Sequence, residues 1–167
     1  MKRSKFLVRA AVIAALYVVL THLQNLIIPD STFWAIQFRA SEALCVLSFF
    51  TPAAVVGLGI GCLLFNLSLS AALPLDALVG TLATLIACGG MYLTRRVTIR
   101  GYPILGMLLP AVANALLVGW ELSVYVGGGF WFNAACVAIG EAAVLLSLGS
   151  ILYYAIRTRH LENKLFG

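Results

Sequence analysis

VRAAVIAALYVVLTHLQNLII, residues 8–28, is an apolar run in which Arg9 is the one formally charged side chain. A helix needs about 20 such residues to cross the hydrocarbon core of a bilayer. The run therefore predicts a membrane-spanning helix, and it sets the pattern for the rest of the chain.

Five further apolar segments follow, at residues 40–50, 52–69, 75–94, 102–124 and 132–157. The segment 40–50 is too short to span alone, unless its helix begins nearer Phe33 or Ile36. Pro52 suits the first turn of the next helix, because its missing N–H costs nothing there. Six spans would use ~120 positions and leave ~47 for loops and ends. We expect an all-α integral membrane protein, a six-helix bundle with residues 1–167 as a single domain.

Composition supports a membrane protein. The chain of 167 residues is 62% hydrophobic and 10% charged, and its mean hydropathy is +1.03. Soluble domains are about 45–50% apolar and about 25% charged. These values exclude a soluble fold.

The basic residues predict the orientation. They cluster at the amino end, between the fourth and fifth apolar segments, and at the carboxyl end: Lys2, Arg3, Lys5, Arg9; Arg95, Arg96, Arg100; Arg157, Arg159, Lys164. Six helices with both termini cytoplasmic put these ten on the cytoplasmic side, as the positive-inside rule expects. Arg39 is the exception. The net charge of +5 therefore needs no nucleic acid partner. A cleaved signal peptide over the first segment is the alternative, although its apolar run is longer than usual.

Polar residues within the apolar segments point to a binding site. Ionisable side chains are costly inside a bilayer, so each is a functional hypothesis. In the six-helix topology they gather toward the outer ends of the helices, which describes a pocket open to the outside. The candidate substrate-binding residues are Gln37, Arg39, Glu42, Asn66, Asn114, Trp120, Glu121, Trp131, Asn133 and Glu141.

Several of these residues have a structural interpretation as well. Arg39 and Glu42 are three apart and would form a local ion pair in a helix. Asp76 would cap a helix, and Asn66 would bond one helix to another. Trp131 would sit at the membrane interface.

The charge balance of the outer layer predicts the chemistry of a ligand. One arginine, Arg39, faces up to four carboxylates: Glu42, Asp76, Glu121 and Glu141. This disfavours an anion and favours a cation or a heterocycle rich in N–H donors. A carboxylate can accept two N–H bonds from the edge of a guanine-like ring, and an aromatic side chain would add about 1–3 kcal/mol by stacking on it.

Two faces of small residues predict close helix packing. Ala10, Ala11, Ala14 and Ala15 form two Ala-x-x-x-Ala steps in the first segment, and Gly57, Gly59 and Gly61 lie in the third. Small residues let helix backbones approach closely in lipid. Each face could pack within its own bundle, and the alanine face could equally meet a partner protein.

The motifs, read in order, resemble one known family. They are Gln37-Phe-Arg-Ala-Ser-Glu-Ala-Leu44, Phe49-Phe-Thr-Pro-Ala-Ala54, Gly57, Gly61-Cys62, Asn66, Asp76, Gly80-Thr81-Leu-Ala-Thr84, Asn114-Ala-Leu116, Gly119, Glu121-Leu122 and Gly140-Glu141. Together they resemble the QueT family, which comprises substrate-binding (S) components of energy-coupling factor (ECF) transporters.

The resemblance implies a six-helix S component that binds a queuosine precursor, a 7-deazaguanine carrying a cyano or aminomethyl group. It also implies partners: a transmembrane T subunit, docked on Ala10, Ala11, Ala14 and Ala15, and two cytoplasmic ATPases. Because the chain lacks a G-x-x-x-x-G-K-[ST] phosphate loop, the ATPases would be separate chains. One of Glu42, Glu121 or Glu141 would read the donor edge of the base.

Other functions are weighed against this one. An S component for another vitamin or purine-like base would share the fold, and a stand-alone secondary transporter would normally need more helices or inverted repeats. The sequence contains no H-E-x-x-H or G-x-S-x-G motif, and its four cysteines show no metal-ligand spacing. We expect no enzyme activity, no cofactor and no metal.

Overall fold

The computed structural model describes residues 2–29, 38–68 and 75–162, and this part of the chain is helical almost throughout. Its one extended pairing is an isolated bridge between Ile99 and Tyr102 in the α3–α4 connection. The expectation of an all-α protein is confirmed.

The helices begin and end close to the predicted apolar segments. They are α1 (Lys2–Ile27), η1 (Ala40–Phe49), α2 (Pro52–Ser68), α3 (Asp76–Thr94), α4 (Ile104–Tyr125), α5 (Phe130–Val144), η2 (Leu145–Gly149) and α6 (Ser150–Thr158). Pro52 opens α2, as expected from its missing N–H. The predicted sixth segment is one helical stretch, Phe130–Thr158, whose middle turn η2 has the wider π-type winding.

Four of the described helical stretches are long and apolar enough to cross a membrane: Arg3–Ile27, Asp76–Thr94, Ile104–Tyr125 and Phe130–Thr158. The other two, η1 and α2, are shorter apolar helices. At 1.5 Å per residue, the 17 residues of α2 extend about 25 Å. The ten residues of η1 form a 3₁₀ helix, which rises about 2.0 Å per residue and reaches about 20 Å.

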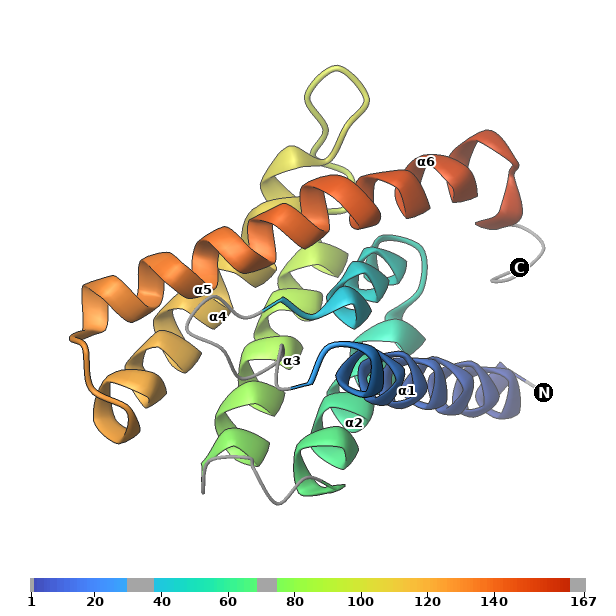
Figure 1. The fold of residues 1–167 in the computed structure, drawn as a ribbon. Coiled ribbons are helices and arrows are strands. Elements are labelled where there is room, and N and C mark those ends of the chain that lie inside the picture. The colour runs from blue at the N-terminus through green and yellow to red at the C-terminus, as the bar shows by residue number, and fades with distance from the viewer. Residues whose placement is uncertain (1, 30–37, 69–74, 163–167) are drawn as a thin grey trace.

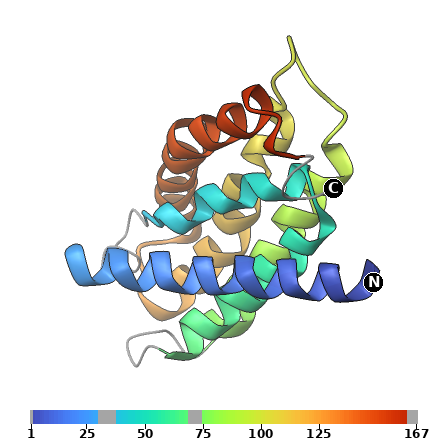
Figure 2. The ribbon, with the colours of Figure 1, turned by 90° about the vertical axis from the view of Figure 1, so that its right-hand side faces the viewer.

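The α-helices pack as neighbours in chain order, α1 on α2, α2 on α3, α3 on α4 and α4 on α5. The short η1 lies in the middle, in contact with helices from both halves of the chain, and Figure 1 shows it between α1 and the α5–α6 stretch. Eight of its ten residues are buried, in keeping with its mostly apolar sequence. The first turn of α1 and the end of α6 point toward the same side in both ribbon views (Figures 1 and 2), opposite the α4–α5 turn.

Small residues bring α1 and α2 close together. A Cβ added at Gly57 would lie 2.6 Å from the Ala10 carbonyl oxygen, and one at Gly61 would lie 2.8 Å from the Cβ of Tyr17. Both distances are shorter than carbon side chains tolerate. The glycines of α2 and the buried Ala10 and Ala14 therefore pack within the bundle, which confirms one of the two expectations for these faces.

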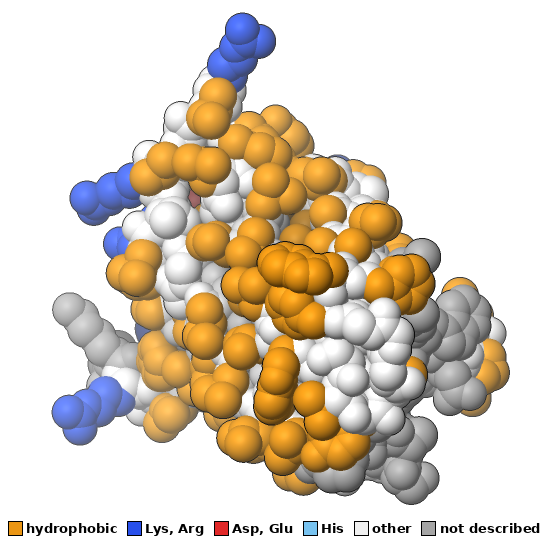
Figure 3. All heavy atoms as spheres, turned by 90° about the vertical axis from the view of Figure 1, so that its left-hand side faces the viewer, with side chains coloured by type: hydrophobic (Ala, Val, Ile, Leu, Met, Phe, Trp, Pro, Cys, Tyr) orange, Lys and Arg blue, Asp and Glu red, His pale blue; other side chains and the backbone are white. Residues whose placement is uncertain are grey.

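The outside of the bundle is apolar. Large hydrophobic side chains such as Leu23, Leu82, Leu116 and Ile139 are exposed. Figure 3 shows a broad hydrophobic face with Lys and Arg side chains along one edge. Such a surface suits lipid, with the basic edge at one membrane interface.

Candidate functional site

Six ionisable or amide side chains from five helical elements meet inside the bundle. Arg39 precedes η1 and Glu42 lies in it; Asn66 ends α2, Asp76 opens α3, Glu121 lies near the end of α4 and Glu141 lies in α5. All six are buried. We call them the polar cluster: Arg39, Glu42, Asn66, Asp76, Glu121 and Glu141. The structure thus brings together residues that are separated by up to 102 positions in the sequence.

Arg39 is the positive charge of the cluster. Its guanidinium interacts electrostatically with Asp76 and Glu42, and its charge also reaches Glu121 and Glu141. The carboxylates act on each other too, Asp76 on Glu121 and Glu42 on Glu141. One cation, Arg39, thus interacts with four carboxylates, as the sequence predicted.

Glu42 is held by hydrogen bonds within the chain. The Tyr17 hydroxyl donates to its Oε1 at 2.6 Å, and the Cys45 thiol donates to its Oε2 at 3.1 Å. Arg39 acts electrostatically on Glu42 as well as on Asp76. Through its bond with Tyr17, Glu42 links η1 to α1.

A second set of bonds fixes the start of η1 against α1. The Thr21 hydroxyl lies 2.7 Å from the Ser41 hydroxyl. The Gln24 side chain donates to the Phe38 carbonyl and accepts from the Ala40 N–H at 2.7 Å. Tyr17, Thr21 and Gln24 are spaced by four and three residues, so they share one face of α1.

Asn66 joins α2 to α3. Its Nδ2 donates to the Asp76 carbonyl at 3.0 Å, and this carbonyl partner fixes the orientation of the amide. The predicted helix-to-helix bond is therefore present. A Cβ added at Gly80 would lie 2.9 Å from this Nδ2, so the glycine leaves the room that Asn66 occupies. Asp76 is the first residue of α3, and Leu75 holds the cap position without a side-chain bond.

Four buried acceptor oxygens of the cluster have no hydrogen-bond partner in the part of the chain that the structure describes. They are Asn66 Oδ1, Glu121 Oε1, Glu121 Oε2 and Glu141 Oε2. Glu121 is fully buried, yet both of its oxygens are unpartnered. A buried polar group without a partner costs roughly 1–3 kcal/mol, so these atoms suit a molecule that brings donors.

The other predicted site residues lie elsewhere. Asn114 is buried on the face of α4 that also carries Glu121, two turns away. Asn133 is buried and donates to the Gly127 carbonyl at 2.7 Å, closing the α4–α5 turn. Trp120 and Trp131 are 48% and 80% exposed, so neither indole is sandwiched in the cluster. Gln37 lies outside the described residues.

The exposure of Trp120 follows from its position next to Glu121. It precedes Glu121 by one residue, and one residue turns a helix by about 100°. If the carboxylate points inward, the indole must point toward a different side of α4.

Sequence analysis did not select Tyr17 as a site residue. Its hydroxyl meets Glu42 across 25 positions of sequence, which no local pattern could predict. The signal that could have found it is the row Tyr17, Thr21 and Gln24, three hydrogen-bonding side chains on one face of a mostly apolar helix.

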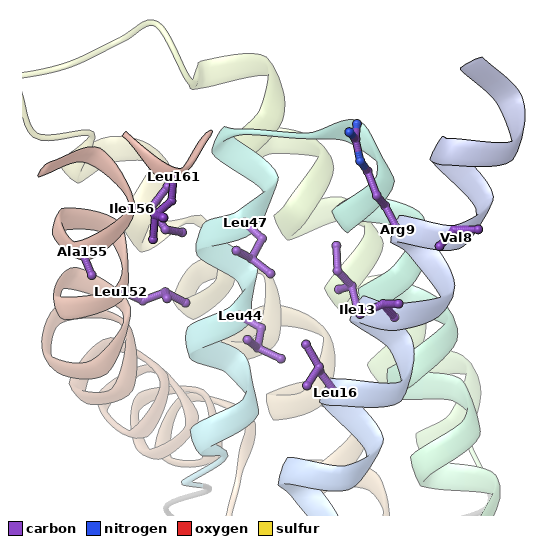
Figure 4. A pocket seen from close by; sticks show the side chains of 11 residues that line it. Val8, Arg9, Ile13, Leu16, Leu44, Leu47, Leu152, Ala155, Ile156 and Leu161 are labelled. Carbon is purple, nitrogen blue, oxygen red and sulfur yellow. The ribbon is translucent and has the colours of Figure 1, made fainter. Parts of the chain in front are cut away.

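Two apolar grooves flank α1, away from the polar cluster. One, of about 650 Å³, lies between α1 and α2 and includes the predicted docking residues Ala10, Ala11, Ala14 and Ala15. Ala11 and Ala15 are exposed, whereas Ala10 and Ala14 are buried. The other, of about 390 Å³, lies between α1, η1 and the carboxyl-terminal part of the chain. Figure 4 shows Ile13 and Leu16 of α1 across from Leu44 and Leu47 of η1, with Arg9 at one end.

Comparison with known proteins identifies the family. The QueT transporter family model matches residues 7–158, which is nearly the whole chain. The chain belongs to the QueT transporter family. It is therefore a multi-pass protein of the bacterial membrane, in agreement with its long apolar helices.

A relative of known name supports the same family. It is the queuosine precursor transporter QueT of Lactococcus lactis subsp. cremoris (strain MG1363), 40% identical over 89 residues. The aligned stretch covers 52% of this chain and 50% of that relative. No solved structure matches the chain significantly.

Proposed function

We propose that this chain captures a queuosine precursor, 7-cyano- or 7-aminomethyl-7-deazaguanine, at the polar cluster. The observation that carries the proposal is the set of four buried acceptor oxygens that have no hydrogen-bond partner among the described residues. Family membership and the name of the relative point to the same ligand.

The chemistry of a deazaguanine complements these atoms. Its pyrimidine edge carries neighbouring N–H donors, and its pyrrole ring carries another. The aminomethyl form adds a cation, which a group of four carboxylates around one arginine favours. Arg39 supplies a donor for the ring carbonyl. A hydrogen bond to a charged group contributes about 1.5–3 kcal/mol, so a few such bonds are sufficient for tight binding.

We further propose that the chain is one substrate-binding domain, the S component of an ECF-type importer. In this arrangement the chain crosses the membrane six times, with η1 and α2 completing the bundle and both termini in the cytoplasm. The basic edge of the surface (Figure 3) supports this orientation. Energy would come from two separate ATPase subunits.

The T subunit would dock on the groove between α1 and α2. Ala11 and Ala15 are the exposed members of the alanine face, and small side chains let a partner helix approach closely. Ala11→Leu should abolish uptake and leave ligand binding by the isolated chain unchanged. Ala10→Leu is the comparison, because Ala10 packs on Gly57 and should instead destabilise the chain itself. If Ala11→Leu supports normal uptake, docking uses another face.

Direct binding tests the proposed ligand. The purified chain is titrated in detergent with 7-aminomethyl-7-deazaguanine, its cyano analogue, guanine and thiamin by calorimetry. Tight binding of either deazaguanine with weak binding of guanine supports the proposal. Binding of thiamin or guanine in preference would assign the cluster to another vitamin or base.

A further inference from the structure

We infer that Glu121 is the residue that reads the two-donor pyrimidine edge of the bound base, and that Glu42, although part of the same cluster, makes no contact with it. This inference rests on the proposed function and divides its three candidate glutamates by role. The two carboxylates differ in what already occupies their oxygens.

Glu121 has the capacity for a two-pronged contact. It is fully buried, and neither Oε1 nor Oε2 has a partner among the described residues. A carboxylate with both oxygens open accepts two parallel N–H bonds, as it does from an arginine. The N–H and amino groups of a guanine-type pyrimidine edge lie side by side and offer that pattern.

Glu42 is less suited to such a contact, because each of its oxygens already accepts a bond from Tyr17 or Cys45. A two-pronged contact at Glu42 would have to share both oxygens with these donors. Glu141 is intermediate: its Oε2 is unpartnered, so it is suited to a single donor such as the pyrrole N–H or an aminomethyl group.

The backbone around Glu121 is fixed by close packing. A Cβ added at Gly119 would lie 2.8 Å from the Ala134 Cα and 2.9 Å from the Ala134 nitrogen. The two helices α4 and α5 therefore touch through their backbones two residues before Glu121 and seven residues, about two turns, before Glu141. This contact places the open carboxylate before any ligand arrives, which lowers the ordering cost of binding.

The charges around Glu121 support binding of a neutral donor edge. Arg39 acts on Glu121 favourably and Asp76 acts on it unfavourably. Two N–H donors would offset the repulsion from Asp76 without adding a second full positive charge next to Arg39. A pyrimidine edge meets this requirement better than an ammonium group does at this position.

The test pairs a change in the protein with a change in the ligand. The probes are 7-cyano-7-deazaguanine and its analogue without the 2-amino group, each titrated against wild type, Glu121→Gln and Glu42→Gln. Removing the amino group should weaken binding to wild type about tenfold or more, since a hydrogen bond to a charged acceptor is lost. In Glu121→Gln the full ligand should bind at least about tenfold more weakly, and the two probes should differ by less than about threefold.

Glu42→Gln is the matched control, one carboxylate changed to an amide in the same cluster. It should keep the wild-type ratio between the two probes, whatever happens to its stability. The inference is overturned if Glu121→Gln also keeps that ratio, or if Glu42→Gln loses it. A wild-type chain that binds neither probe would instead contradict the proposed function, and the inference with it. A single symmetric elution peak and a cooperative melting transition identify variants that are folded.

Discussion

Glu42 and Glu121 are two buried carboxylates of one cluster, and they differ in the hydrogen bonds they accept. On the α1–η1 side, Glu42 accepts from Tyr17 and Cys45, and neighbouring hydroxyl and amide groups bond across the same seam. On the α4 side, Glu121 accepts nothing from the described residues. The hydrogen bonds of the first region join helices. In the second region Glu121 is available to accept hydrogen bonds from a ligand, because no described residue donates to it.

The comparison shows that residue type and burial do not reveal a role. Hydrogen-bond partners do reveal the role, because a buried oxygen without a partner lowers the stability of the ligand-free protein by roughly 1–3 kcal/mol. Costs of this kind persist at functional sites, where the ligand offsets them. The two sides can be separated experimentally by disturbing each one alone.

The largest effect is expected at the contact between α4 and α5 that lies near Glu121. Gly119→Ala places a Cβ within 3 Å of the Ala134 backbone, so α4 and α5 must move apart. Such overpacking costs about 1–3 kcal/mol and should also displace Glu121. We expect a lower melting temperature together with loss of deazaguanine binding. Gly89→Ala is the control, because nothing lies within 4 Å of its added Cβ. If the control is as damaging as Gly119→Ala, the contact is not the cause.

A smaller effect is expected at the contact between α1 and η1, where Tyr17 donates to Glu42. Tyr17→Phe removes one donor and leaves a buried carboxylate oxygen of Glu42 without a partner, at a cost of about 1–3 kcal/mol. Thermal unfolding should report this loss, while the ratio of affinities between related ligands stays unchanged. The matched control is Tyr153→Phe, another buried tyrosine, whose hydroxyl bonds to none of the described residues; it should be nearly neutral. A change in ligand selectivity in Tyr17→Phe would show that this side also reads the ligand.

The smallest effect is expected where Gly80 of α3 packs against Asn66 of α2. Gly80→Ala brings a Cβ to 2.9 Å from the Asn66 amide nitrogen, and the amide must shift by a few tenths of an ångström. Its free Oδ1 then moves relative to the ligand, so affinity should fall severalfold, about 1 kcal/mol. Stability should change little, since alanine favours a helix over glycine by about 0.5–1 kcal/mol. Unchanged affinity would remove Asn66 from the set of ligand contacts.

Much of this arrangement was predictable from the sequence. The lengths of the apolar runs predicted the helices, and Pro52 predicted the start of α2. The polar residues were expected to meet because they lie at helix ends that share one side of the membrane, and Arg39, Glu42, Asn66, Asp76, Glu121 and Glu141 do meet. These predictions depend on lengths and on charge, which the local sequence encodes.

The remaining features depend on contacts between distant segments. The 3₁₀ winding of η1 and the π-type turn at Leu145–Gly149 arise where η1 and η2 pack together. The bond from Tyr17 to Glu42 joins segments 25 positions apart. The exposure of Trp120 and Trp131 depends on how each helix is rotated about its axis. No pattern of spacing in a single sequence shows which of two glutamates already accepts hydrogen bonds from other residues of the chain.

The most direct test of the central claim measures stability and binding together in wild type and Glu121→Gln. Without ligand, the variant should melt at a higher temperature, because a neutral amide replaces a buried carboxylate that has no partner. With 7-cyano-7-deazaguanine, the order should reverse, because the wild type gains more stabilisation from the ligand than the variant does. If the variant melts lower without ligand and gains as much from ligand as wild type, Glu121 is structural and the account is contradicted.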